Sequence, residues 1–156
     1  MSKNYIFKVT KRLRDANIAH RLLNYDGPCK NIHGHTYHFE ITIGSDKLDS
    51  LGMVIDFNEI KKICDDFIQD NFDHGFLIWK EDQELLELVN KIETKKYIFS
   101  KNTTAENLAE FLFHSFRAEI EKNKENNCEL IEVKVWETET SVATYTNKYN
   151  AEYYKK

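Results

Sequence analysis

The chain has 156 residues, of which 41% are hydrophobic and 13% aromatic, and its formal net charge is −4. This length and apolar content fit one compact domain with a buried core, so a single domain over residues 1–156 is expected. The acidic balance and the scattered lysines argue against nucleic acid as a partner, because a phosphate backbone requires a concentrated positive field. No apolar run approaches the roughly 20 residues of a membrane span, and no signal peptide is recognisable, which predicts a cytoplasmic protein with no membrane partner.

Strand patterns occur at both ends of the chain. Residues 5–10 and 37–43 are rich in β-branched and aromatic side chains, as paired strands are, and the turn signal Asp26-Gly27-Pro28 lies between them. Residues 130–136 and 141–149 show the same signals, which predicts two closing strands. A short strand is also predicted over residues 97–99.

Helical spacing begins near residue 58, where apolar side chains share one stripe: Ile60, Ile63, Cys64, Phe67 and Ile68. A second helix is expected from Thr103 or Thr104 to about residue 122, with Thr103 and Glu106 as a capping box, and a shorter one over residues 83–91. The order β-β-α-α-β-β indicates an α+β fold in which a helix pair covers one face of an antiparallel sheet. Its two open edges favour oligomerisation.

The run from Cys29 to His35 carries the strongest chemical signal. Alternate residues of an extended strand face the same side, so His33 and His35 present two imidazoles together. With His20, they form a three-histidine set that leaves a coordination position open. Zinc suits this set best, although iron, nickel and copper also accept imidazole. His38, on the other face of the strand, and His114, within a helix, are interpreted as structural.

Cys29 has two interpretations. A thiol near a bound cation has a lowered pKa and can act as a nucleophile or base. Alternatively, Cys29 is a fourth metal ligand that closes the site and makes it structural, and spacing alone does not separate these roles. Cys64 is interpreted as a small buried side chain in a helix, and Cys128 lies in a predicted polar turn.

Several polar residues are further candidates. Asp73 could hold His74 in one tautomer as an acid/base pair, or His74 could end a helix with Gly75 as its cap. Glu137, at the end of an apolar strand, could grip an N–H-rich heterocycle or be solvated. Thr104 and Glu106 also suit helix capping. Candidates for binding phosphate by charge and proximity alone are Lys11, Arg12, Arg21 and Lys30.

In their order along the chain, these pieces resemble the 6-pyruvoyl-tetrahydropterin synthase and 6-carboxy-tetrahydropterin synthase family. The matching runs are Ala19-His20-Arg21-Leu22, Cys29 with His33-Gly34-His35, Gly52-Met53-Val54-Ile55-Asp56-Phe57, Asp73-His74, Thr104-Ala105-Glu106-Asn107 and Glu137-Thr138. They span nearly the whole chain. Two departures are Ile78, where the family often has Asn, and Thr103, where Pro is common. The stretch over residues 79–101 is also longer than in the shortest members.

The resemblance implies a tunnelling fold that assembles as a homohexamer of two trimers. By the family pattern, zinc would be bound by His20, His33 and His35. Cys29 would be the proton-abstracting thiolate, and Asp73 with His74 its relay. Glu137 would anchor the pterin ring, with Thr104 and Glu106 lining the same pocket.

The implied substrate is 7,8-dihydroneopterin triphosphate. The expected product is 6-carboxy-5,6,7,8-tetrahydropterin, formed with release of acetaldehyde and triphosphate for queuosine synthesis. The alternative within the family is the pyruvoyl-forming synthase of tetrahydrobiopterin synthesis, which eliminates triphosphate only. A branch that makes a folate precursor has glutamate in place of the cysteine, and Cys29 argues against it. From another class, the chain could be a non-catalytic zinc-binding assembly module.

Overall fold

A long β-hairpin is the frame of the molecule in the computed structural model, which describes residues 4–122 and 127–146. Its first arm is split into β1 (Phe7–Arg12) and β2 (Ala16–His20), and both pair antiparallel with one edge of β3 (His33–Ser45). Between the pairs Arg12↔Glu40 and Ala16↔Tyr37, three residues of the first arm face two of β3. This bulge separates β1 from β2, where the sequence pattern predicts one strand that ends at residue 10.

The other strands extend the sheet in both directions. On the far edge of β3, β6 (Glu129–Thr138) and then β7 (Ser141–Thr146) continue the antiparallel sheet. Beyond β2, β4 (Gly75–Trp79) and β5 (Lys96–Phe99) are added in parallel, giving the order β5-β4-β2-β3-β6-β7 with β1 also paired to β3. The antiparallel expectation is therefore wrong for β4 and β5. Residues 147–149 of the last predicted strand lie outside the described part.

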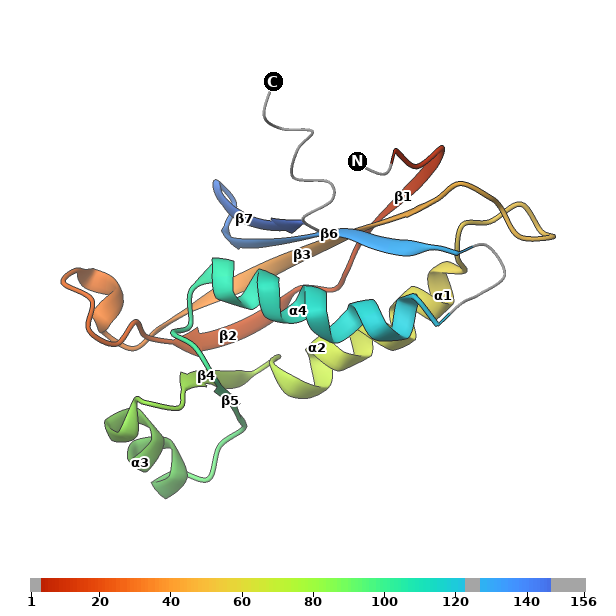
Figure 1. The fold of residues 1–156 in the computed structure, drawn as a ribbon. Helices are drawn as coiled ribbons and strands as arrows, with labels where there is room; N and C mark the ends of the chain where they lie inside the picture. Colours follow the sequence, from red (N-terminus) through yellow and green to blue (C-terminus); the bar gives the residue numbers. More distant parts are fainter. Residues whose placement is uncertain (1–3, 123–126, 147–156) are drawn as a thin grey trace.

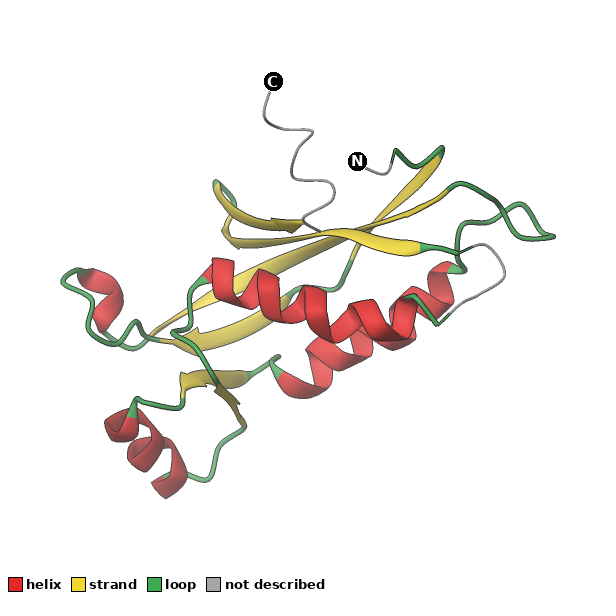
Figure 2. Cartoon of the chain, in the orientation of Figure 1, coloured by secondary structure: helices red, strands yellow, loops and turns green. Residues whose placement is uncertain are grey.

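The predicted helix pair is confirmed and covers one face of this sheet (Figures 1 and 2). The first member is a continuous segment of α1 (Phe57–Ile60), a π-helical turn (Lys61–Asp65) and α2 (Asp66–Asn71); the second is α4 (Ala105–Ile120). Their apolar stripes pack with the odd-numbered residues of β3 in one core, which includes Tyr37, Phe39, Ile60, Ile68, Leu112 and Phe116. None of the helices in the described ranges is long and apolar enough to cross a membrane.

The start of α4 differs by one residue from the predicted capping box. The N-cap is Thr104, whose hydroxyl accepts a hydrogen bond from the Asn107 backbone N–H at 3.3 Å. Thr103 instead is buried, and its hydroxyl donates to the Arg21 carbonyl at 2.8 Å. Thr103, which precedes the N-cap, is therefore hydrogen-bonded to the residue that follows β2.

A third helix, α3 (Gln83–Lys91), has the predicted bounds and lies at the β4–β5 end of the molecule (Figure 1). Leu77 of β4 belongs to the main core, whereas Phe76 and Ile78 pack in a second cluster with α3. Because neighbouring residues of a strand face opposite sides, α3 covers the sheet face away from α2 and α4.

Candidate metal centre

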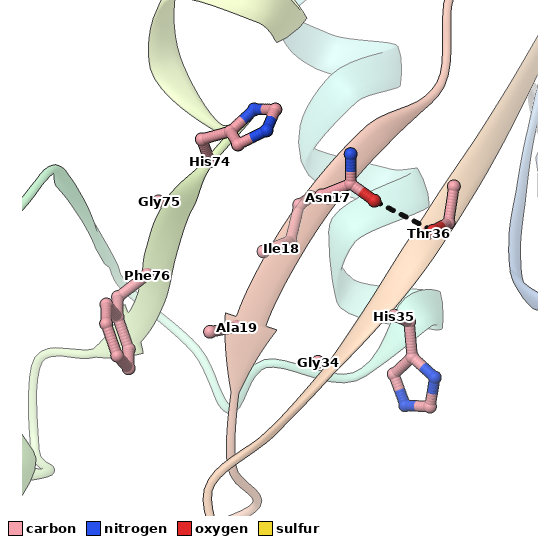
Figure 3. A pocket seen from close by; sticks show the side chains of 9 residues that line it. All are labelled: Asn17, Ile18, Ala19, Gly34, His35, Thr36, His74, Gly75 and Phe76. Carbon is pink, nitrogen blue, oxygen red and sulfur yellow. Dashed lines mark hydrogen bonds between the residues drawn. The ribbon is translucent and has the colours of Figure 1, made fainter.

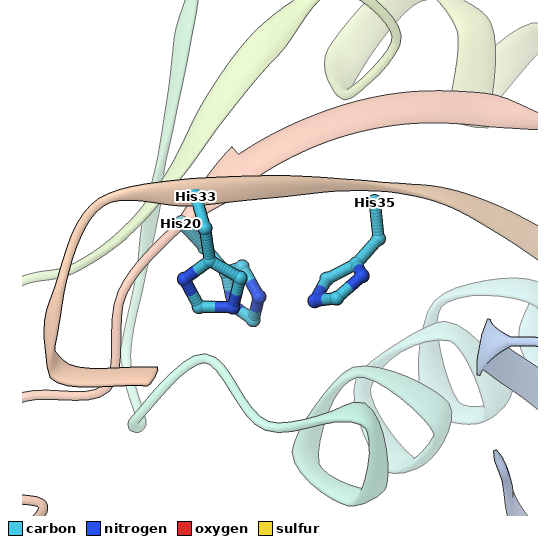
Figure 4. Close-up of side chains that lie close together, drawn as sticks. All are labelled: His20, His33 and His35. Atoms are coloured by element: carbon cyan, nitrogen blue, oxygen red, sulfur yellow. The ribbon is translucent and has the colours of Figure 1, made fainter. Parts of the chain in front are cut away.

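Three histidines converge where the long hairpin reaches its loop (Figure 4). His20 ends β2, directly across from His33 at the start of β3, and His35 follows two residues later on the same face. One ligand nitrogen from each ring lies within 4.8 Å of the other two. The structure therefore brings together all three predicted metal ligands.

Backbone carbonyls fix the orientation of two of these rings. His20 Nδ1 lies 2.9 Å from the Thr103 carbonyl oxygen, and His33 Nδ1 lies 2.8 Å from that of Asn31. A carbonyl only accepts, so each Nδ1 carries the proton and each Nε2 keeps its lone pair. His33 Nε2 and His35 Nε2 are buried without a hydrogen-bond partner among the described residues. Such unpaired acceptors are costly, and a metal ion is the group that would satisfy them together.

Burial favours the neutral form of two of these imidazoles, those of His20 and His35. Burial lowers the pKa of His20 to about 4, aided by His33 and His35 and opposed by the Thr103 carbonyl and Glu137. Burial also lowers the pKa of His35. Neutral imidazole is the form that binds metal, and three such ligands with an open position fit a zinc ion.

Tyr37 joins the histidine cluster to Glu137. The fully buried Tyr37 hydroxyl donates to Glu137 Oε1 at 2.9 Å and lies 3.2 Å from His20 Nε2. Burial, then Glu137 and Cys29, raise the pKa of Tyr37, so its hydroxyl keeps the proton that it donates. Sequence reasoning missed Tyr37, although its position two residues after His35 on the same strand face was a usable signal.

Four of the other predicted site residues line one pocket of about 350 Å³: Cys29, Thr104, Glu106 and Glu137. Cys29 lies in a short 3-10 turn between β2 and β3, and its carbonyl accepts from the Leu22 N–H at 2.8 Å. Its thiol is not a member of the cluster of metal-ligand atoms found in the described part of the chain. That placement favours a residue beside an open site over a fourth ligand.

Asp73 and His74 form the predicted pair, but His74 lines a different pocket from that of Cys29. His74 Nδ1 lies 2.7 Å from Asp73 Oδ2, while Asp73 Oδ1 accepts from the Asn17 N–H at 2.8 Å. Burial tends to raise the pKa of Asp73, but the Asn17 N–H, His74 and Lys95 together hold it below its usual value. The helix-cap alternative is wrong, because α2 ends at Asn71, His74 itself adopts a positive φ of 56°, and Gly75 begins β4.

The pocket beside His74 has a volume of about 390 Å³ and shares no lining residue with the pocket of Cys29. Figure 3 shows this pocket with His74 on one side of β2 and His35, a candidate metal ligand that also lines the pocket, on the other. Within one chain, the acid/base pair and the thiol are therefore presented to different spaces.

The remaining histidines and cysteines have structural partners. His38 Nδ1 lies 2.7 Å from Asp15 Oδ1, within ion-pair distance although not aligned for a hydrogen bond, and His114 Nε2 lies 3.2 Å from the Tyr145 hydroxyl. Cys64 is buried on the helix stripe, as expected. Cys128 is also buried, which corrects its assignment to a polar turn, and burial raises its pKa to about 11.

Comparisons with known proteins agree with this arrangement. The family model described as 6-pyruvoyl tetrahydropterin synthase matches residues 8–148. A 6-carboxy-5,6,7,8-tetrahydropterin synthase of Rickettsia typhi is 40% identical over 67% of this chain and 75% of its own length. One from Haemophilus influenzae is 32% identical over 90% of this chain and 99% of its own.

Solved structures show the same fold. An uncharacterized protein from Wolinella succinogenes matches with a TM-score of 0.78 and 20% identity, covering 91% of this chain and 98% of its own. The 6-pyruvoyl tetrahydropterin synthase of Plasmodium falciparum matches with a TM-score of 0.68 and 16% identity, covering 92% and 99%. By the family match and these relatives, the chain belongs to the 6-pyruvoyl tetrahydropterin synthase family.

Proposed function

We propose that this protein is a zinc-dependent 6-carboxy-5,6,7,8-tetrahydropterin synthase. It acts in the cytoplasm on 7,8-dihydroneopterin triphosphate and releases acetaldehyde and triphosphate, as a step toward queuosine. The observation that carries the proposal is that the Nε2 atoms of His33 and His35 are buried and unpaired. Tyr37, the next residue on the same strand face, donates a hydrogen bond to Glu137. The names of the Rickettsia and Haemophilus relatives support the carboxy-forming reaction.

In this proposal His20, His33 and His35 hold the zinc ion. When bound there, zinc would supply a Lewis acid that lowers the pKa of a substrate hydroxyl. The carboxylate of Glu137 accepts hydrogen bonds from the N–H groups of the pterin ring, and Tyr37 fixes one of its oxygens in place. Thr104 and Glu106 line the pocket beside the ring.

Cys29 is the proposed base. As a thiolate it removes a carbon-bound proton from the hydroxyl-bearing side chain, which lets the side chain rearrange and expel triphosphate. Water then adds to the side-chain carbon next to the ring and supplies the second oxygen of the carboxyl group. The bond from this carbon to the next one breaks, and the next carbon takes up a proton, so that two side-chain carbons leave as acetaldehyde. A proton relay must reach the thiol during these steps.

The relay is proposed to come from a second copy of the chain. His74, which is paired with Asp73, lines a pocket separate from that of Cys29, and 77% of the His74 side chain is exposed. A homohexamer of two trimers would place the His74 of one subunit beside the Cys29 of another. Within residues 4–122 and 127–146, the outer edges of β1 and β7 pair with no further strand, which leaves room for such assembly.

The product assay decides the reaction. Purified protein loaded with zinc is incubated with 7,8-dihydroneopterin triphosphate, and acetaldehyde and triphosphate are both measured. Equal amounts of the two products are expected. Triphosphate without acetaldehyde would instead identify the pyruvoyl-forming reaction, and neither product would exclude both.

A further inference from the structure

The residue after the first metal ligand is held in a buried ion pair. Arg21 Nε lies 2.7 Å from Asp82 Oδ2, and Arg21 Nη2 lies 2.6 Å from Asp82 Oδ1. The Asp82 side chain is 2% exposed and that of Arg21 17% exposed. Glu84 adds a second, solvent-facing carboxylate at 2.7 Å. With its guanidinium occupied in this way, Arg21 is a poor candidate for binding the substrate triphosphate.

Asp82 is itself fixed by the helix that it begins. It is the N-cap of α3, and its Oδ1 also accepts from the Leu85 N–H at 3.1 Å. Leu85 and Val89 anchor α3 on Ile78 of β4 in the second apolar cluster. The bidentate contact therefore links Arg21 to the N-terminus of a packed helix.

A short chain of hydrogen bonds continues from Arg21 to the metal ligand. The Arg21 carbonyl accepts from the Thr103 hydroxyl at 2.8 Å, and the Thr103 carbonyl accepts from His20 Nδ1 at 2.9 Å. Asn102 Nδ2 adds a bond to the Leu23 carbonyl at 3.1 Å. The ring of His20 is thus oriented by the carbonyl of Thr103, and Thr103 is in turn held by the backbone carbonyl of Arg21.

A buried ion pair is an expensive way to gain stability, because desolvation of both charges offsets their attraction. Its advantage is geometric, because a planar guanidinium that binds a carboxylate through two parallel hydrogen bonds fixes the relative orientation of the two side chains. We propose that Arg21 and Asp82 are positioning residues for the zinc ligand His20, and that the α3 segment is thereby part of the zinc site. This inference rests on the proposed function, because it takes the three histidines to be zinc ligands.

The test measures zinc affinity of the metal-free full-length protein by competition with a chromophoric chelator. Asp82→Asn removes the charge that holds Arg21, and we expect zinc affinity to fall about tenfold, as when outer partners of a metal ligand are changed. Glu84→Gln is the matched control within the same cluster. Because the Glu84 side chain is 84% exposed, its zinc affinity should stay within about twofold of wild type.

A second control separates positioning from general loss of stability. Asp65 is another buried aspartate beside an arginine, accepting from the Arg14 N–H at 2.8 Å at the bulge between β1 and β2. Asp65→Asn should lower the melting temperature yet leave zinc affinity unchanged. If it weakens zinc binding as much as Asp82→Asn does, the positioning role is overturned.

Further outcomes distinguish the two proposals. A folded Asp82→Asn protein with wild-type zinc affinity overturns the positioning role alone. If the wild-type protein takes up no zinc, the proposed function falls and this inference with it. Should Asp82→Asn fail to fold, Arg21→Lys takes its place, since it keeps the charge but loses the fork; weakened affinity supports the role, and unchanged affinity overturns it.

Discussion

The two halves of the candidate site are built in opposite ways. The histidine cluster is partly enclosed: His20 is 1% exposed while His33 and His35 are half-buried, and backbone carbonyls orient the rings of His20 and His33. The Asp73–His74 pair is open, with 77% of the His74 side chain exposed beside a pocket that does not contain Cys29. The difference teaches that one chain brings together three possible metal ligands, whereas it presents its acid/base pair and its thiol to different pockets.

The largest effect is expected from removing a ligand of the enclosed half. His33→Ala leaves two imidazoles, too few for a stable zinc site, so stoichiometric zinc should be lost after dialysis against a weak chelator. Metal analysis of the purified protein measures this. His38→Ala is the matched control, because His38 is on the opposite face of the same strand and pairs with Asp15. One zinc per chain in His33→Ala would refute the assignment.

Cys29 distinguishes an open catalytic site from a closed structural one. Cys29→Ala should reduce turnover by at least about 10²-fold, the usual contribution of a positioned base, while zinc stays bound. Cys64→Ala controls for loss of a buried thiol away from the site. If Cys29→Ala instead loses zinc, the thiol is a ligand and the chain is better described as a zinc-binding assembly module.

Mixed assemblies test whether the open half is supplied by a neighbour. Cys29→Ala and His74→Ala are each expected to be nearly inactive alone. Co-assembled in equal amounts, they should regain activity at about a quarter of the sites, because a random mixture gives that share an intact Cys29 and a partner's intact His74. Refolding the two variants together and assaying triphosphate release measures this. Activity no higher than that of either variant would place both residues of a site in one chain.

Tyr37 should affect substrate binding more than metal binding. Tyr37→Phe removes the hydrogen bond to Glu137, and losing a bond to a charged group costs about 1.5–3 kcal/mol at most, so we expect KM to rise about tenfold. Zinc content should be unchanged. Tyr97→Phe, in an aromatic cluster away from the histidines, is the control. An unchanged KM would show that Glu137 needs no such support.

The sequence predicted the enclosed half better than the open one, for physical reasons. His33 and His35 are two residues apart on one strand, so their shared face follows from strand geometry alone. The pocket faced by His74 depends on β4, which joins β2 in parallel and is covered on both faces. Its run Gly75-Phe76-Leu77-Ile78-Trp79 therefore lacks the alternation by which half-exposed strands are recognised.

Long-range contacts account for the other misses. The ion pair of Arg21 with Asp82 joins residues far apart in sequence, and no local spacing indicates it. The start of α4 was predicted at Thr103 or Thr104, because both suit an N-cap, and only the capping box was placed one residue early. The structure decides between them by using the Thr103 hydroxyl to hold the Arg21 carbonyl.

The smallest predicted effect concerns the pH dependence of stability at the open half. The folded-state pKa of Asp73 is depressed, so its contribution is fully present above its unfolded pKa of about 3.9 and is lost as the pH falls through the lower folded value. Asp73→Asn should therefore lower the melting temperature at pH 7 by a few degrees, and the difference from wild type should shrink as the pH falls below the unfolded value and through the lower folded one. Thermal unfolding of both metal-free proteins across this range measures it. A difference that persists in acid would show that Asp73 acts through packing and not through its charge.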